Sequence, residues 1–157
     1  MTSDHESRHD VRIRPATAAD RAAVVGLLQA AGLPAAGVSP RLEGFLIAER
    51  EGRPVGAVGL EAYGPDALLR SAVVDPGARG TGVGAALVDC LLQQADERKV
   101  RAVYLLTTTA ERWFPRFGFQ PIERDAVASG VRDSVEFREA CPASATVMRR
   151  VADGAPG

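Results

Sequence analysis

The chain is poor in the residues that build metal centres and disulfide scaffolds. Its two cysteines, Cys90 and Cys141, lie far apart and form no CxxC pair. Its two histidines, His5 and His9, both fall in the polar N-terminal stretch. A disulfide scaffold is not expected at this length and composition, and a zinc site would lack histidine ligands in the rest of the chain. The sequence therefore predicts no metal site.

Long apolar runs and a strong net charge are also missing. No stretch approaches the roughly 20 apolar residues that a bilayer-spanning helix needs, and the start of the chain has no apolar signal-peptide core. The formal net charge is -1, from 19 basic and 20 acidic residues. Such a balance creates no global field that would attract nucleic acid or an anionic membrane. We expect a cytoplasmic protein with neither of these partners.

What remains is the composition of an ordinary globular protein. The 157 residues, 46% hydrophobic and 25% charged, suit one domain with one core. We expect a disordered tail over residues 1–10, a single domain over residues 11–152 and a second tail over residues 153–157.

Hydrophobic periodicity and turn residues predict a mixed α/β (α+β) chain. A pattern that resembles a capping box, from Thr17 to Asp20, predicts the start of the first helix. The inner face of this helix should carry Val24, Leu27, Leu28 and Ala31. The expected strands are 11–14, 45–49, 55–61, 67–74, 100–106, 119–123 and 146–151. Further helices are expected at 83–99 and 109–117, with part of 125–140 helical. The three strands between residues 45 and 74 should form an antiparallel meander, and the order as a whole is not that of a doubly wound sheet.

A glycine-rich loop leads from the last meander strand into the long helix, and it reads Arg79-Gly80-Thr81-Gly82-Val83-Gly84. Glycines let the backbone approach a ligand closely. Free N–H groups at a helix start, together with the helix dipole, attract a pyrophosphate. Arg79 could add a charged contact to a phosphate, and Thr81 a hydroxyl. The alternative is a glycine-rich helix entry that holds no ligand.

Two common nucleotide motifs do not fit this loop. A Walker loop needs lysine and then serine or threonine after its last glycine, whereas Ala85 and Ala86 follow here. A dinucleotide fingerprint has the spacing GxGxxG after the first strand of a parallel sheet, whereas the spacing here is GxGxG after a meander. The loop therefore predicts a different phosphate-bearing ligand.

With these motifs in place, the chain resembles the GNAT family of N-acetyltransferases. The family motif is Arg/Gln-x-x-Gly-x-Gly/Ala after a strand that ends near Val-x-Pro, and it is matched by Val74, Pro76, Arg79, Gly82 and Gly84. The segment 110–119, AERWFPRFGF, looks like the family's second motif, A-x-x-x-Tyr-x-x-x-Gly-Phe. Both motifs stand in the family's order.

The resemblance implies the GNAT fold and acetyl-coenzyme A as the acetyl donor. The fold would be a mixed, mostly antiparallel sheet of six or seven strands, flanked by four or so helices and splayed between its fourth and fifth strands. The pantetheine arm would pair with the backbone of Ala72, Val73 and Val74. Its amide would bond Thr107, which stands where the family has asparagine. The pyrophosphate would lie on the 79–84 loop, and the amine would attack the thioester directly.

One position departs from the family pattern. Many members carry a tyrosine in the second motif that protonates the leaving thiolate, and Phe114 takes its place. The coenzyme A thiol is a moderate acid, so it could leave without a donor or take a proton from water. Alternatively, Phe114 packs against the pantetheine arm.

Three residues are candidates for handling the acceptor amine. Glu61 ends an apolar run and is the first candidate for the general base, with an exposed hairpin carboxylate as the alternative. Arg70 lies inside an apolar strand, where a buried arginine needs an anionic partner, either Glu61 or the carboxylate of an amino-acid substrate. Ser71 is the second candidate for substrate binding. The two-residue period of a strand places it on the face opposite Arg70, Ala72 and Val74.

Three further stretches of the sequence bear on the acceptor. The stretches 68–71, 104–112 and 137–145 also resemble a branch of the family named for arsenic resistance, which implies an amino-acid-like acceptor, an arsenical one among the candidates. Cys141 in the last stretch is interpreted as a small buried hydrophobe. The alternatives to a small-molecule acetyltransferase are a protein lysine or N-terminal acetyltransferase and a non-catalytic coenzyme A sensor. A homodimer is common in the family and is a candidate assembly here.

Overall fold

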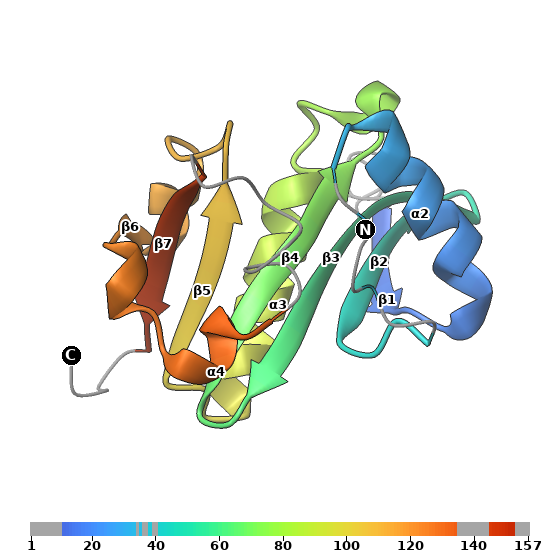
Figure 1. Ribbon diagram of the computed structural model, residues 1–157. Coiled ribbons are helices and arrows are strands. Elements are labelled where there is room, and N and C mark those ends of the chain that lie inside the picture. The colour runs from blue at the N-terminus through green and yellow to red at the C-terminus, as the bar shows by residue number, and fades with distance from the viewer. Residues whose placement is uncertain (1–10, 34, 36–37, 39–40, 135–144, 153–157) are drawn as a thin grey trace, which may run out of the picture. The chain divides into compact units, whose positions relative to one another are not determined.

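Seven strands form a mixed sheet in the part of the chain that the computed structural model describes, residues 11–33, 35, 38, 41–134 and 145–152 (Figure 1). Their order is β1-β2-β3-β4-β5-β7-β6. The strands are β1 Val11–Pro15, β2 Phe45–Arg50, β3 Arg53–Tyr63, β4 Asp66–Val74, β5 Ala102–Thr107, β6 Gln120–Pro121 and β7 Thr146–Val151. The helices are α2 Arg21–Ala30, α3 Val83–Glu97 and α4 Ser129–Arg132, with short 3-10 helices η1 Ala18–Asp20, η2 Pro76–Ala78, η3 Phe114–Phe117 and η4 Arg124–Ala126. The expected fold class is confirmed.

The chain divides into two compact units, which are described separately. Unit 1 consists of the described residues of Met1–Gly59 and Ser71–Leu91, and unit 2 of those of Leu60–Arg70 and Leu92–Gly157. Strands β3 and β4 and helix α3 each run from one unit into the other. The single domain over residues 11–152 stays a prediction. The two expected tails, Cys141 and the end of the 125–140 region lie outside the described residues.

Unit 1 is built on an antiparallel sheet whose main turn was visible in the sequence. β1 pairs with β2, and β2 pairs with β3, so that Arg50 lies opposite Arg53. Glu51 and Gly52 between them have φ values of 53° and 78°. A two-residue turn in which both residues have positive φ matches the twist of the two strands that it joins, and glycine adopts such a φ without steric strain. The expected hairpin is therefore confirmed.

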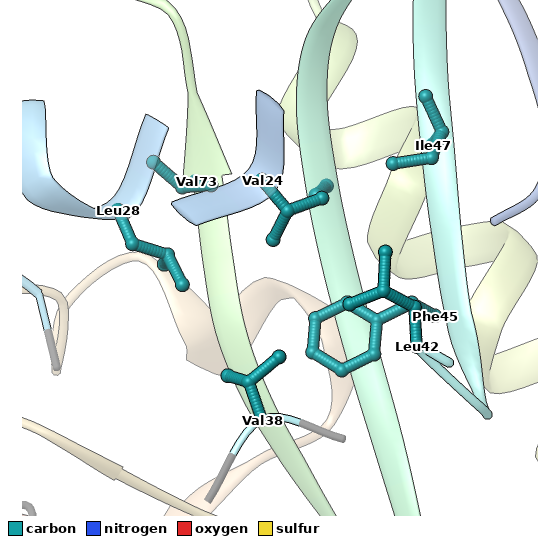
Figure 2. Packing of buried hydrophobic residues seen from close by; sticks show 8 residues of the cluster. Val24, Leu28, Val38, Leu42, Phe45, Ile47 and Val73 are labelled. Atoms are coloured by element: carbon teal, nitrogen blue, oxygen red, sulfur yellow. The ribbon is translucent and has the colours of Figure 1, made fainter. Parts of the chain in front are cut away.

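Helix α2 covers one face of this sheet and supplies its apolar core (Figure 2). Val24 and Leu28 are fully buried and pack in one cluster with Phe45, Ile47 and Val73. Full burial of side chains of this size stabilises the fold by roughly 1.5–3 kcal/mol each. Leu27 and Ala31 pack against the cluster from its edge, as the helical period predicted. The Thr17 N–H donates to the Asp20 carboxylate at 2.8 Å, which confirms the capping box.

Helix α3 begins against the other face of the same sheet. Ala57 points into the α2 cluster, so its neighbour Gly56 faces the opposite side. A Cβ atom on Gly56 would lie 3.0 Å from the Leu87 side chain and 3.2 Å from that of Val83. The absence of a side chain at Gly56 thus lets the first turns of α3 approach the sheet closely, which fixes where this helix starts.

Unit 2 contains the parallel part of the sheet. β4 pairs with β5 in parallel over three residues, from Asp66–Ala102 to Leu68–Tyr104, and β5 pairs with β7 in antiparallel fashion along its whole length. Both β4 and β5 continue past the last paired residues, as a splay between them requires. On one face, Leu68, Tyr104 and Val147 pack with Val131 of α4 in a second apolar cluster.

Two elements of unit 2 are shorter than expected. The helix expected at 109–117 is wrong, because only the 3-10 turn η3 forms there. Pro115 at its start has no N–H to continue a helix, and Gly118 ends it with a φ of 95°. The strand expected at 119–123 is reduced to Gln120–Pro121, since Pro121 cannot donate to a neighbouring strand.

Helix α3 ends two residues earlier than its apolar period suggested. Lys99 adopts a φ of 62°, and the Val100 N–H donates to the Ala95 carbonyl at 2.9 Å. The Lys99 N–H donates to the Asp96 carbonyl at 3.0 Å. These two bonds satisfy the last carbonyls of the helix in the manner of a Schellman motif, which is why α3 stops at Glu97.

Candidate active site

The glycine-rich loop lies wholly in unit 1, between the end of β4 and the start of α3. Asp75 fixes its entry: its N–H donates to the Val55 carbonyl at 2.8 Å, and its carboxylate accepts from the Gly77 N–H at 3.1 Å. After η2, Gly80 and Gly82 have φ values of 80° and 88°. Side chains rarely adopt this left-handed region, so the two glycines set the path of the loop.

The backbone of this loop presents hydrogen-bond donors at the positive end of a 15-residue helix. The Ala86 N–H donates to the Gly82 carbonyl at 3.0 Å and opens the helical pattern, so the N–H groups of Val83, Gly84 and Ala85 precede it. A Cβ atom on Gly80 or Gly82 would meet no other atom within 4 Å. The loop therefore has open space beside its donors, which fits a pyrophosphate.

The side chains of the loop are used for holding its shape. The Arg79 Nε donates to the Val74 carbonyl at 3.3 Å, which leaves the terminal guanidinium nitrogens of this exposed residue for a ligand. The Thr81 hydroxyl donates to the Ala78 carbonyl. Val83 is buried under the loop. Contacts from this loop to a ligand would thus come from backbone N–H groups and from Arg79.

The strand before the loop breaks the expected alternation. Ser71 has a φ of 60°, a left-handed conformation within β4. The prediction that Arg70, Ala72 and Val74 share one face is therefore wrong, because a strict two-residue period requires extended backbone throughout. Val73 points into the α2 cluster, so Ala72, Val73 and Val74 can offer a ligand their backbone, as the family resemblance implied.

Glu61 and Arg70 meet in unit 2. The Arg70 Nη1 donates to Glu61 Oε2 at 3.2 Å. The Arg70 side chain has no exposed surface, whereas that of Glu61 keeps 23%. The sequence allowed two anionic partners for Arg70, Glu61 or the carboxylate of a substrate, and in the structure Arg70 pairs with Glu61. Glu61 is therefore the member of the pair whose side chain reaches the surface.

Tyr63 belongs to the same cluster and was missed in the sequence. Its hydroxyl donates to Glu61 Oε1 at 2.7 Å. Burial and the Glu61 carboxylate raise the pKa of Tyr63 to about 12, while a hydrogen bond with Ser134 acts in the opposite direction. The spacing Glu61-x-Tyr63 on one strand places both side chains on the same face, which was the available signal. We call Glu61, Tyr63, Arg70 and Ser134 the Glu61 cluster.

The two family positions of the second motif also lie in unit 2. The Thr107 hydroxyl oxygen accepts from the Ala110 N–H at 2.9 Å and from the Thr109 N–H at 3.3 Å, so it shapes the turn that follows β5. Phe114 is buried, with its ring centre 5.0 Å from that of Trp113 and 5.6 Å from that of Phe119. Phe114 is thus held in an aromatic group of its own unit.

Each unit therefore holds part of the predicted site. The 79–84 loop, Ser71 and residues 72–74 lie in unit 1, and Glu61, Arg70, Thr107 and Phe114 lie in unit 2. No group of three or more metal-binding side chains occurs among the described residues. Within the same residues, none of the helices has both the length and the apolar character to cross a membrane.

Comparison with known proteins decides the family. The Acetyltransferase (GNAT) domain family matches residues 41–121, just over half of the chain and the part that contains the loop. The chain belongs to the GNAT acetyltransferase family.

Solved structures match nearly the whole chain. A Mycobacterium tuberculosis protein in complex with coenzyme A and a second ligand shares 26% identity, covers 90% of this chain and 99% of its own, and superposes with a TM-score of 0.74. N-acetylglutamate synthase from Neisseria gonorrhoeae, complexed with coenzyme A and L-arginine, has a TM-score of 0.77 at 21% identity over 91% of this chain and 33% of its own. These matches confirm the GNAT fold.

Curated relatives are named amino-acid acetyltransferases. The relative from Mycobacterium tuberculosis is 37% identical over 95 residues, which cover 58% of this chain and 54% of that protein. The relative from Aeromonas salmonicida is 31% identical over 84 residues, 52% of this chain and 19% of that protein. The chain thus spans about half of one relative and a fifth of the other. The names point to amino-acid acetylation in those proteins rather than to arsenic resistance.

Proposed function

We propose that this GNAT protein transfers the acetyl group of acetyl-coenzyme A directly to the amine of an amino acid or amino-acid analogue. The observation that carries the proposal is the 79–84 loop, whose open backbone donors stand at the N-terminus of α3. Membership in the GNAT family supports acetyl-coenzyme A as the ligand of this loop. The names of the curated relatives support an amino acid as the acceptor.

Acetyl-coenzyme A would supply the acetyl group as a thioester, which an amine can attack without an acyl-enzyme intermediate. The N–H groups of Val83, Gly84 and Ala85 would donate to its pyrophosphate, and Arg79 would add a charged contact. The backbone of residues 72–74 and the hydroxyl of Thr107 are the proposed partners of its pantetheine arm. These contacts hold the donor, and none of them selects the acceptor.

Glu61 is the proposed general base. The acceptor arrives as an ammonium ion and must lose a proton before it can attack. The Glu61 side chain keeps part of its surface exposed, so its carboxylate could accept that proton directly or through a water molecule. Arg70 has its guanidinium on the buried side of Glu61, so its role in substrate binding would be indirect, through the carboxylate that it holds. Ser71 remains a proposed substrate contact.

The leaving thiolate has no proton donor at position 114. The ring of Phe114 lies in the aromatic group with Trp113 and Phe119, and it would border the pantetheine arm as an apolar wall. The low basicity of a thiolate, compared with an alkoxide, makes departure without an acid feasible. We therefore propose a reaction that needs a base but no side-chain acid.

The finer identity of the acceptor is proposed from the sequence. An arsenical amino acid is proposed only on the sequence resemblance of three short stretches. A small-molecule amine is the expected partner, without nucleic acid or membrane, and a homodimer is the candidate assembly. A protein lysine or N-terminal acetyltransferase and a non-catalytic coenzyme A sensor are the competing functions.

The experiment is a thiol-release assay with acetyl-coenzyme A and a panel of free amino acids, arsenical and phosphinic analogues, and peptides. We expect turnover with an amino acid or analogue, and a kcat about 100-fold lower in Glu61→Gln, because a positioned base contributes at least about that factor. Glu49→Gln is the matched control, since Glu49 is also a strand carboxylate bonded to an arginine, at 3.1 Å from Arg14. It should keep the wild-type kcat.

Each competing function has its own outcome. Turnover with peptides and not with amino acids would favour a protein acetyltransferase. Coenzyme A binding without turnover of any amine would favour the sensor and overturn the proposal.

A further inference from the structure

Tyr63 makes a contact that the proposed function does not use. It ends β3, and its hydroxyl donates to Glu61 Oε1 at 2.7 Å while Arg70 donates to Oε2 at 3.2 Å. Each oxygen of the Glu61 carboxylate therefore has its own donor. Two donors on different oxygens restrict rotation of a carboxylate about its last bond more than one donor does.

The other side of Tyr63 contacts the segment around α4. Ser134, a residue with only 4% of its surface exposed, lies close enough to the Tyr63 hydroxyl to act on its pKa. Gly130 of α4 lies directly against the same side chain, because a Cβ atom added there would be 3.4 Å from the Tyr63 Cβ. Tyr63 is thus fixed by α4 from one side and bonded to Glu61 on the other.

We propose that Tyr63 is a positioning residue that holds the Glu61 carboxylate in the orientation in which it accepts the proton of the acceptor amine, with Ser134 fixing the Tyr63 hydroxyl in turn. The inference rests on the proposed function, because it assigns to Glu61 the role of the base. It adds that the efficiency of this base depends on a phenol from its own strand and on a buried serine beyond α4.

The chemistry of the contact fits a donor that does not itself react. The pKa of Tyr63 is raised to about 12, by burial first and by the Glu61 carboxylate second, so the phenol keeps its proton at every pH used in an assay. Of the described residues, the charged groups that act on it are Glu61 and Arg70, and both belong to the Glu61 cluster. Tyr63 therefore donates a hydrogen bond to the Glu61 carboxylate and keeps its own proton.

A purely structural role for Tyr63 is the competing explanation, because its side chain packs against the apolar cluster of unit 2. Tyr63→Phe keeps the ring and removes only the hydroxyl, so packing is preserved. Tyr104→Phe is the matched control, since Tyr104 is a tyrosine of the same apolar cluster but lies on β5 and not on the strand of Glu61. Both variants should bind coenzyme A as the wild type does and differ little in melting temperature.

The test is the measurement of kcat and of KM for the acceptor in Tyr63→Phe, Ser134→Ala, Tyr104→Phe and the wild type. Loss of a hydrogen bond to a charged group predicts about a tenfold lower kcat in Tyr63→Phe. The loss should fall on kcat and leave the KM for the acceptor within about twofold of the wild-type value, because Tyr63 acts through Glu61. Ser134→Ala should lower kcat by a smaller amount, and Tyr104→Phe should follow the wild type.

A second measurement separates this inference from the proposed function. The ¹³C chemical shift of the Glu61 carboxyl group, measured by NMR at one neutral pH, reports the contact with Tyr63 without any turnover. An unchanged chemical shift in Tyr63→Phe, or a kcat equal to that of the wild type, would overturn the positioning role alone. A wild type that turns over no amine would overturn the base role of Glu61 and the catalytic meaning of the contact, even if the chemical shift changes.

Discussion

The 79–84 loop and the Glu61 cluster are built in opposite ways. The loop is one continuous segment that offers backbone N–H groups, and its side chains mostly hold its shape. The Glu61 cluster consists of side chains from β3, β4 and the residues after α4, and its backbone contributes only their placement. A backbone site depends on conformation, whereas a side-chain site depends on which atoms are brought together.

This difference suggests a division of roles. In a backbone site, many side chains can be exchanged as long as the dihedral angles are kept, which suits a ligand that is the same for every member of a family. In a side-chain site, each exchange alters the chemistry, which suits an acceptor that varies between members. The donor would therefore be recognised by the loop and the acceptor by the Glu61 cluster.

The largest expected effect comes from a side chain placed in the loop. Gly82→Asp adds strain at a φ of 88° and puts a negative charge into the open space beside the helix N-terminus. We expect the affinity for coenzyme A to fall by at least about 100-fold, or about 2.7 kcal/mol, as measured by isothermal titration calorimetry. The Glu61 cluster should keep its structure, because it lies outside the loop.

Gly52→Asp is the matched control for this variant. Gly52 has a φ of 78° and open space around it, but it lies in the β2–β3 hairpin. It should lose a similar amount of stability and keep its affinity for coenzyme A. Equal loss of affinity in the two variants, or none in Gly82→Asp, would show that the loop is not the pyrophosphate site.

The same difference explains what the sequence could predict. The loop was recognised from its glycine spacing and the helix after it, because both are local. The meander was recognised for the same reason, with Glu51 and Gly52 at its hairpin. The helix expected at 109–117 was wrong because the apolar period there reflects the packing of Trp113, Phe114 and Phe117 around a short 3-10 turn.

The Glu61 cluster was only half predicted. The need of a buried Arg70 for an anion follows from electrostatics, and Glu61 was among the candidates. The φ of 60° at Ser71 could not be predicted, because serine has no special preference for left-handed backbone. This φ is the reason why the expected alternation of side chains along β4 was wrong. The bond from Tyr63 to Glu61 had a local signal in their spacing, whereas the contact of Tyr63 with Gly130 depends on where α4 packs, which is set by contacts distant in sequence.

A smaller effect is expected from a carboxylate–arginine pair outside both sites. Both oxygens of Asp20 accept from Arg14 at 2.9 Å, and these bonds lower the pKa of Asp20 to about 2. A lowered carboxyl pKa stabilises the fold above the unfolded value of 3.8, and this stabilisation is lost as pH falls toward 2. It amounts to about 2 kcal/mol.

The variant Asp20→Asn isolates that contribution. The free energy of unfolding, measured with urea, should be lower in the variant than in the wild type. This difference should be about 2 kcal/mol smaller near pH 2 than near pH 6. The kcat of the variant at neutral pH should equal that of the wild type. A difference that does not change with pH would contradict the assignment. A loss of kcat would extend the functional region beyond the loop and the Glu61 cluster.

The smallest effect is expected at Phe114, where the family often has tyrosine. If the thiolate leaves without a side-chain acid, its protonation does not limit the rate. Phe114→Tyr should then change kcat by less than about threefold, because the new donor acts on a step that is not rate-limiting. Phe117→Tyr is the control, since Phe117 belongs to the same aromatic group, with its ring centre 6.4 Å from that of Phe114. A rise in kcat of more than about tenfold in Phe114→Tyr alone would show that proton transfer to the thiolate limits the reaction. The chemistry would then depend on both the Glu61 cluster and position 114, and the division between a backbone site for the donor and a single side-chain cluster for the acceptor would fail.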